Sequence, residues 1–223
     1  GSNPSASSVF GNLLYTPIAV DLFGLPYENP LDGSSVYYRP SNDIQHPIWT
    51  VKNSFTGQKI NRIFGNMSVK YDIAKNMNIM YRVGYDQYGD YNYYSQNKGG
   101  VVGGNDFQLG FHRTVAGFNM IWDHSLLYNW QADLNSDWRL NVDAGLNSQD
   151  RSYEQTGQRS TQQLVYGLFD HDNFVIHDNN TEDGGRIDFK SRFLSLGAFA
   201  QGLLSYKEYL FFTVGGRNSW SSN

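Results

Sequence analysis

The sequence predicts an all-β protein whose antiparallel strands, about six in hairpins, form part of a transmembrane β-barrel wall with long extracellular loops. Three observations lead to this prediction. Apolar and polar residues alternate along several segments, short turns alternate with long connections, and the chain is rich in aromatic residues although its mean hydropathy is −0.53. Aromatic residues make up 16% of the 223 residues, with 16 Tyr and 14 Phe. Strands of outer-membrane barrels alternate in this way and carry aromatic girdles.

The overall composition removes several classes of protein. The 17 Lys and Arg against 21 Asp and Glu give a formal charge of −4 without a long basic block, so we expect no nucleic-acid partner. The absence of cysteine excludes a disulfide framework and thiolate metal sites. No stretch approaches the roughly 20 apolar residues of a spanning helix. Residues 1–12 lack the pattern of a signal peptide.

The alternation predicts three hairpins. They join residues 62–73 to 77–85, residues 118–130 to 138–147, and residues 194–205 to 210–217, through short turns. The second hairpin is less regular, because Ile121 and Leu127 fall out of register. Each strand is expected to be near the ~9–11 residues of a tilted spanning strand. The apolar face takes the odd positions of the first hairpin and most even positions of the other two.

The polar faces and the connections also favour a barrel. The polar faces carry mainly Asn, Ser, Gly, Gln and Thr rather than many Lys and Glu, which suits a hydrated lumen. Residues 86–108 and 148–190 are predicted as long extracellular loops, opposite the short turns. Aromatic residues near the strand ends fit interfacial girdles, although ordinary β-propensity explains each of them equally well. They are Tyr71, Tyr85, Tyr128, Trp130, Trp138, Tyr206 and Tyr209.

The N-terminal region differs in kind. We expect residues 1–58 to form an irregular lumen or loop segment with a short helix, and residues 59–223 to form the barrel segment. The helix is predicted to be capped by Ser7 or Ser8 and to end before Pro17.

Three segments resemble a known family, the SusC/RagA type of TonB-linked outer-membrane transporter of Bacteroidetes. They are "HPIWTVKNS" (46–54), the hairpin "VKYDIAKNMNIMYRVGYD", and "GAFAQGLLSYKEYLFFTVGGRNSWSS" near the C-terminus. The last match is the most specific. It matches the family pattern at six positions, and Ser219 stands where Asp is usual. The six matching residues are Gly216, Arg217, Asn218, Trp220, Ser221 and Ser222.

The resemblance implies a role in transport. Family members have about 22 strands around a plugged lumen, so the chain resembles a middle portion of such a barrel, a fragment without the plug domain and the remaining strands. The implied function is import of glycans or peptides across the outer membrane. The implied partners are outer-membrane lipid, a SusD-like lipoprotein, the TonB complex through the missing plug region, and an oligosaccharide or peptide substrate. No cofactor is implied.

The stretch "DQYGDYNYYSQN" holds the candidate ligand-binding residues. Tyr88, Tyr91, Tyr93 and Tyr94 could stack on sugar faces or pack against a covering lipoprotein, with Asp90 and Asn92 as hydrogen-bonding neighbours. The alternative is that these tyrosines only pack the extracellular loops together.

Two other functions stay open. A soluble or surface-exposed β-sheet carbohydrate-binding module would pack its apolar faces on each other. An outer-membrane hydrolase would need an acidic stretch to converge with a Ser or His site. No catalytic or metal-binding motif accompanies that stretch, so we predict a solvated acidic loop and no enzyme activity. The stretch comprises Asp170, His171, Asp172, His177, Asp178, Glu182 and Asp183.

Overall fold

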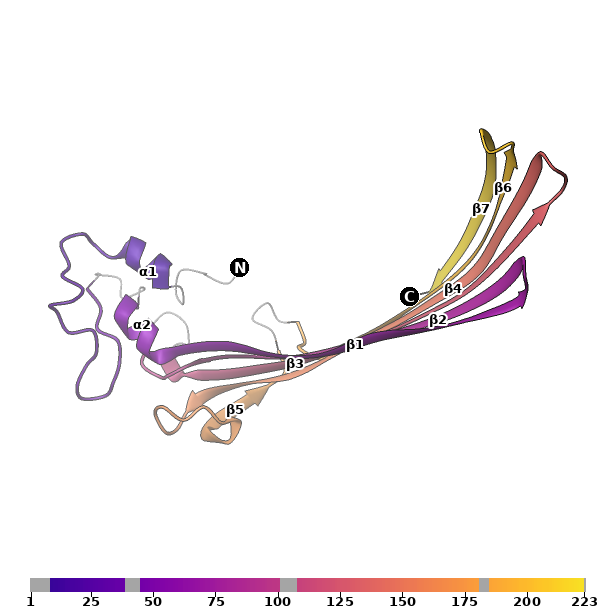
Figure 1. Ribbon diagram of the computed structural model, residues 1–223. Helices are drawn as coiled ribbons and strands as arrows, with labels where there is room; N and C mark the ends of the chain where they lie inside the picture. Colours follow the sequence, from indigo (N-terminus) through magenta and orange to yellow (C-terminus); the bar gives the residue numbers. More distant parts are fainter. Residues whose placement is uncertain (1–8, 39–44, 101–107, 181–184, 223) are drawn as a thin grey trace. The chain divides into compact units, whose positions relative to one another are not determined.

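The protein is an all-β chain, as predicted. A computed structural model describes residues 9–38, 45–100, 108–180 and 185–222 (Figure 1). Within these ranges, strands dominate and form one seven-stranded, mostly antiparallel sheet with the order β1-β2-β3-β4-β6-β7, while β5 pairs with β4. The elements are α1 (Val9–Tyr15), α2 (Pro47–Asn53), β1 (Ser54–Ala74), β2 (Met77–Gln96), β3 (Phe111–Asp133), β4 (Trp138–Gln163), the 3-10 helix η1 (His171–Asn173), β5 (Phe174–Asp178), β6 (Phe189–Tyr206) and β7 (Leu210–Ser222).

The three predicted hairpins are present with their turns. β1 and β2 are joined through residues 75–76, β3 and β4 through residues 134–137, and β6 and β7 through residues 207–209. The last turn places Lys207 and Glu208 at positive φ, 45° and 60°. The helix predicted before Pro17 is also present as α1, while its predicted caps Ser7 and Ser8 lie outside the described residues.

The predicted strand lengths are wrong. β1 to β4 have 21, 20, 23 and 26 residues, and β6 and β7 have 18 and 13, against the expected nine to eleven. Half of the predicted loop 86–108 is therefore strand β2. Strand β4 and the short strand β5 likewise occupy much of the predicted loop 148–190. In these extensions both faces are polar, so the alternation disappears while the backbone ladder continues.

The register of the last hairpin confirms one apolar and one polar face. Even residues of β6 pair with even residues of β7, which sets Leu204 beside Phe212 and Leu196 beside Trp220. Odd residues pair with odd, which sets Gln201 beside Gly215 on the other face. Because successive side chains of a strand point to opposite faces, the two sets stay separate along the hairpin.

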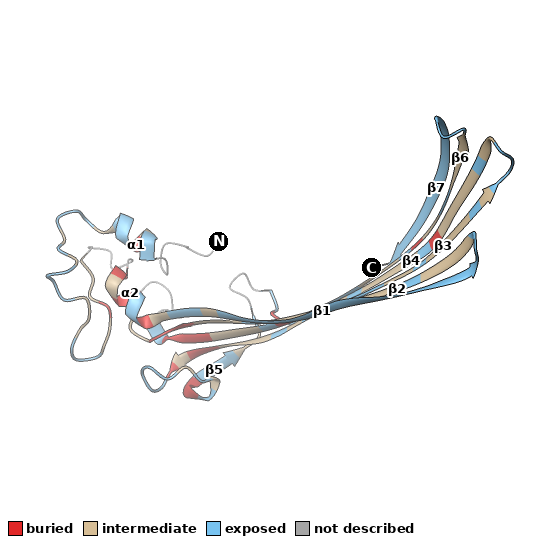
Figure 2. Ribbon diagram, in the orientation of Figure 1, coloured by how far each residue is buried: buried red, intermediate tan, exposed pale blue. Residues whose placement is uncertain are grey.

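The chain forms two compact units, and β1, β2, β3, β4 and, with its first residue, β6 contribute to both. Unit 1 contains residues 1–60, 90–117 and 155–189, and unit 2 contains residues 61–89, 118–154 and 190–223. These units are defined by contacts within the chain, whereas the expected boundary at residue 58 separates an irregular segment from a barrel segment. That boundary stays a prediction. Among the described residues, the buried side chains lie in unit 1 (Figure 2).

The core of unit 1 is small and largely polar. Trp49 of α2 is fully buried, and its Nε1 donates to the carbonyl oxygen of Gly33 at 2.8 Å. The helix α2 was not predicted. It begins because the Nδ1 atom of His46 accepts a hydrogen bond from the backbone N–H of Ile48 at 3.2 Å, with Pro47 at the first turn. Asn12 of α1 donates to the Thr50 hydroxyl at 3.2 Å and ties the two helices together.

Unit 2 has no side-chain core of its own. Among its described residues only Gly145 and Gly197 are buried. Residues of the predicted apolar face are exposed instead, such as Met67 at 62% and Phe212 at 63%. In the described part of unit 2 the apolar face is therefore a surface that the chain does not cover.

Candidate functional site

The predicted ligand-binding residues lie on strand β2 and not in a loop. Tyr88, Asp90, Asn92 and Tyr94 occupy even positions of the strand, whereas Tyr91 and Tyr93 occupy odd positions. Alternation therefore divides them between two faces. The predicted loop position is wrong for the physical reason given above, since a strand with two polar faces leaves no alternation in the sequence. Their role in binding stays a prediction.

Four of these residues have local contacts. The ring of Tyr93 lies over Gly57, where a Cβ would come within 2.5 Å of the Tyr93 Cε1 atom. Tyr94 meets Phe111 edge to face, with ring centroids 4.8 Å apart. Asn92 donates a hydrogen bond to the Asp90 carboxylate. Part of the cluster thus packs within the sheet, while Tyr91 is 41% exposed.

An open groove of about 590 Å³ lies over four strands of unit 1. We call it the Arg113 groove. Its lining combines hydroxyl, amide and aromatic side chains with one charged group, the guanidinium of Arg113. It includes three of the predicted residues. The lining comprises Thr56, Gly57 and Gln58 of β1, Asn92, Tyr93 and Tyr94 of β2, Arg113 and Val115 of β3, and Gln155 of β4.

The guanidinium of Arg113 is not neutralised by the described part of the chain. Its Nε atom is buried and has no hydrogen-bond partner, and no ion pair joins Arg113 to a described residue. Other arginines of the sheet behave differently, because Arg62 pairs with Asp86 at 2.7 Å and Arg192 with Asp150 at 2.6 Å. A buried donor without an acceptor is costly, and an incoming anion that accepts a hydrogen bond from it would relieve that cost.

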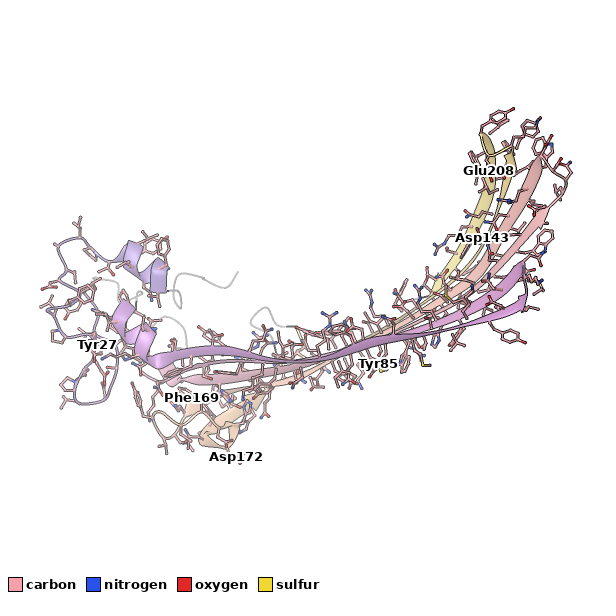
Figure 3. The ribbon with its side chains drawn as sticks, viewed as in Figure 1. Tyr27, Tyr85, Asp143, Phe169, Asp172 and Glu208 are labelled. Atoms are coloured by element: carbon pink, nitrogen blue, oxygen red, sulfur yellow. The ribbon has the colours of Figure 1, made fainter. Side chains whose placement is uncertain are left out.

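The polar face of unit 2 carries a hydrogen-bonded polar ladder, which we define as Asn129, Asn141, Asp143 and Gln201. Asn129 Nδ2 lies 2.9 Å from Asn141 Oδ1 and 2.7 Å from Asp143 Oδ1. Gln201 Nε2 donates to the other oxygen of Asp143 at 3.2 Å (Figure 3). The ladder joins β3, β4 and β6, and all four residues occupy odd positions, opposite the apolar face.

The acidic stretch is folded against β4 and does not form a solvated loop throughout. Asp170 caps η1 by accepting from the backbone N–H of Asp172 at 3.3 Å, and Asp178 of β5 pairs with Arg159 at 3.7 Å (Figure 3). The predicted Glu182 and Asp183 lie outside the described residues. Among the residues with described positions, no group of three or more His, Cys, Asp or Glu is placed to hold a metal ion.

A histidine cluster lies beside the acidic stretch. The Ser160 hydroxyl contacts Nδ1 of His171 at 2.7 Å and Nδ1 of His177 at 2.8 Å, and the rings of His112 and His171 lie 4.5 Å apart. Burial, followed by the neighbouring His171, lowers the pKa of His112 to about 4. Ser160 is fully buried, so this Ser–His arrangement packs the unit and does not present its hydroxyl at the surface.

The Arg113 groove was not recognised in the sequence. Its residues come from four strands separated by long connections, and only the register between those strands brings them together. The available signal was weak: extending the alternation backward from Phe118 would have placed Arg113 on the polar face, but the apolar Phe111 and Val115 share its parity and obscure the pattern.

No protein-family model and no curated protein matches the sequence. Solved structures do match the fold. The first is a RagAB peptide transporter, with a TM-score of 0.70 and 11% sequence identity over 84% of this chain. Two others are RagAB peptide importers in a closed-closed and an open-open state, with TM-scores of 0.68 and 0.66 and identities of 12% and 11% over 80% and 85% of this chain.

The chain spans about a fifth of the length of each RagAB chain that it matches, namely 20%, 19% and 20%. At these identities the likeness concerns the fold, which is related to the RagAB fold. No helix in the described part of the chain is both long and apolar enough to cross a membrane.

Proposed function

We propose that the chain forms part of the wall of an outer-membrane transporter that imports peptides or glycans. The observation that carries the proposal is the two-sided sheet of unit 2, with an uncovered apolar face opposite the polar ladder. In a bilayer the apolar face meets lipid and the polar face meets water. We assign the membrane-spanning part to unit 2 and place unit 1 outside the hydrocarbon layer.

The fold likeness to RagAB supports this proposal and extends it. A transporter of this type would work with a SusD-like surface lipoprotein and would draw energy from the TonB complex through a plug region. We propose the cell outer membrane as the location and no catalytic activity. Under this proposal both faces of the strands in unit 1 meet water and need no alternation.

The proposal is tested by asking which face of one hairpin meets lipid. Phe212 and Thr213 are neighbours on β7, so their side chains point to opposite faces of the sheet. They pair with Leu204 and Leu203 of β6, respectively. Each is changed to Cys in turn, in the protein that carries this chain. The chain itself contains no cysteine, so it contributes no competing thiol. The label is an environment-sensitive fluorophore, and the protein is reconstituted with brominated lipids.

We expect bromine to quench the label on Phe212→Cys strongly and the label on Thr213→Cys weakly. A water-soluble thiol reagent should show the opposite preference. Equal quenching of both labels would refute the membrane assignment.

A carbohydrate-binding module remains the second candidate, because the Arg113 groove contains the tyrosines Tyr93 and Tyr94. It predicts a protein that stays monomeric without detergent, with the apolar face of unit 2 covered. Sedimentation in detergent-free buffer separates the two functions.

A further inference from the structure

We propose that the Arg113 groove is a binding site for a carboxylate group of a peptide ligand. The inference rests on the proposed function, since import of peptides supplies the ligand class, and it adds a specific site and a preference for acidic peptides. The starting point is the guanidinium of Arg113, which is partly buried and has no partner among the described residues.

The charge of the groove selects an anion. Arg113 is the one charged residue of the lining, and the other polar groups are neutral amides and hydroxyls. A guanidinium presents its N–H donors as a planar fork that matches the two oxygens of a carboxylate. The buried Nε atom is one of the donors of that fork, and it lacks an acceptor in the described structure.

The rest of the lining suits a peptide. Gln58, Asn92 and Gln155 bring amide side chains from three different strands, and amides carry the donor and acceptor groups that a peptide backbone pairs with. Asn92 already donates to the Asp90 carboxylate. Gln155 is held in place because its Nε2 donates to the carbonyl oxygen of Ile187 at 2.8 Å. Val115 and Tyr94 supply apolar contact area beside these amides, whereas the ring of Tyr93 lies over Gly57.

The size and position of the groove are consistent with a ligand site. Its volume of about 590 Å³ falls inside the range of roughly 300–1,000 Å³ for ligand pockets. Within unit 1, Arg113 and Val115 occupy odd positions of β3, so alternation directs both side chains to the same face of that strand.

The test measures peptide binding to the protein that carries this chain, purified in detergent. The probes are two six-residue peptides of Gly and Ser with an uncharged fluorophore and an amidated C-terminus, one with two Glu residues and one with two Gln residues. The variant Arg113→Gln removes the charge and keeps a polar side chain. Arg82→Gln, at an exposed position of unit 2, changes the net charge equally outside the groove.

We expect Arg113→Gln to weaken binding of the Glu peptide by about 10- to 100-fold, the range for a charged hydrogen-bonded pair. Binding of the Gln peptide should be unchanged, and Arg82→Gln should behave as the unaltered protein. If Arg113→Gln weakens both peptides equally, or neither, the proposal is wrong. Tighter binding of an oligogalacturonate than of the Glu peptide would also overturn it, in favour of an acidic glycan.

A second variant keeps the proposal testable if Arg113→Gln does not fold. Gln58 is an exposed lining residue of β1, and Gln58→Glu places a carboxylate inside the groove. We expect this variant to abolish the preference for the Glu peptide, because the new carboxylate forms an ion pair with the guanidinium of Arg113. An unchanged preference would count against the site. A negative result in the peptide-binding test does not affect the lipid-quenching test on β7. The binding site and the membrane assignment can therefore be refuted separately.

Discussion

The uncovered apolar face of β1 makes a quantitative prediction about membrane depth. Met67 lies seven residues before Ala74, the last residue of β1. At about 3.3 Å per residue this is about 23 Å along the strand, and a tilt of about 45° reduces the depth to about 16 Å. That is close to the middle of a hydrocarbon layer of about 30 Å. Met67 is 62% exposed, so lipid would be its surroundings.

We expect Met67→Arg to lower the free energy of unfolding by about 2–4 kcal/mol, the cost of arginine on the lipid face at mid-depth. The matched control is Ser68→Arg on the opposite face, which should change stability by less than about 1 kcal/mol, because its charge remains in water. The assay is guanidinium unfolding of the protein in lipid vesicles, followed by tryptophan fluorescence. Equal losses for the two variants, or a larger loss for Ser68→Arg, would refute the assignment of the faces.

Three further predictions concern unit 1. His112 has a pKa near 6.5 in the unfolded chain and about 4 in the folded chain, so the folded state is at its most stable above pH 6.5. The free energy of unfolding should fall by about 1–2 kcal/mol as the pH drops from 6.5 to 4, with solvent screening taken into account. Hydrogen exchange of β3 measures this loss. Trp49→Phe should cost about 1 kcal/mol by loss of the Nε1 bond, and Trp49→Ala about 3–5 kcal/mol, in thermal proteolysis. Gly157→Ala should destabilise by about 1–3 kcal/mol, because its Cβ would lie 2.6 Å from Ile187 Cγ2 and closer still to a backbone oxygen, whereas Gly202→Ala in open space should not.

The sequence was informative wherever one face of a strand is apolar. The turns after Ala74, Asp133 and Tyr206 and the two faces of the last hairpin follow from period-two alternation alone. The prediction failed along 86–96 and 148–163, because strands with two polar faces look like loops when only hydropathy is considered.

The candidate site was predictable in part. Tyr93, Tyr94 and Asn92 were singled out for their residue types, and they do line the groove. Arg113 was missed because what marks it is that its buried Nε atom has no hydrogen-bond partner among the described residues. Only three-dimensional packing shows whether a side chain has a partner.

The uncovered face of unit 2 has a consequence for how such a sequence can change over time. Side chains that meet fluid lipid need only be apolar, since no rigid neighbour fixes their shape, whereas an interior position must also fit its surroundings. Under the proposed membrane assignment, Ile63, Met67 and Val69 could therefore exchange freely among aliphatic and aromatic types. Gly145 could not, because the Phe199 ring lies over it, with Cε1 2.5 Å from where a Cβ would stand. Such tolerance is compatible with a likeness that concerns the fold alone, a TM-score of 0.70 with 11% of residues identical.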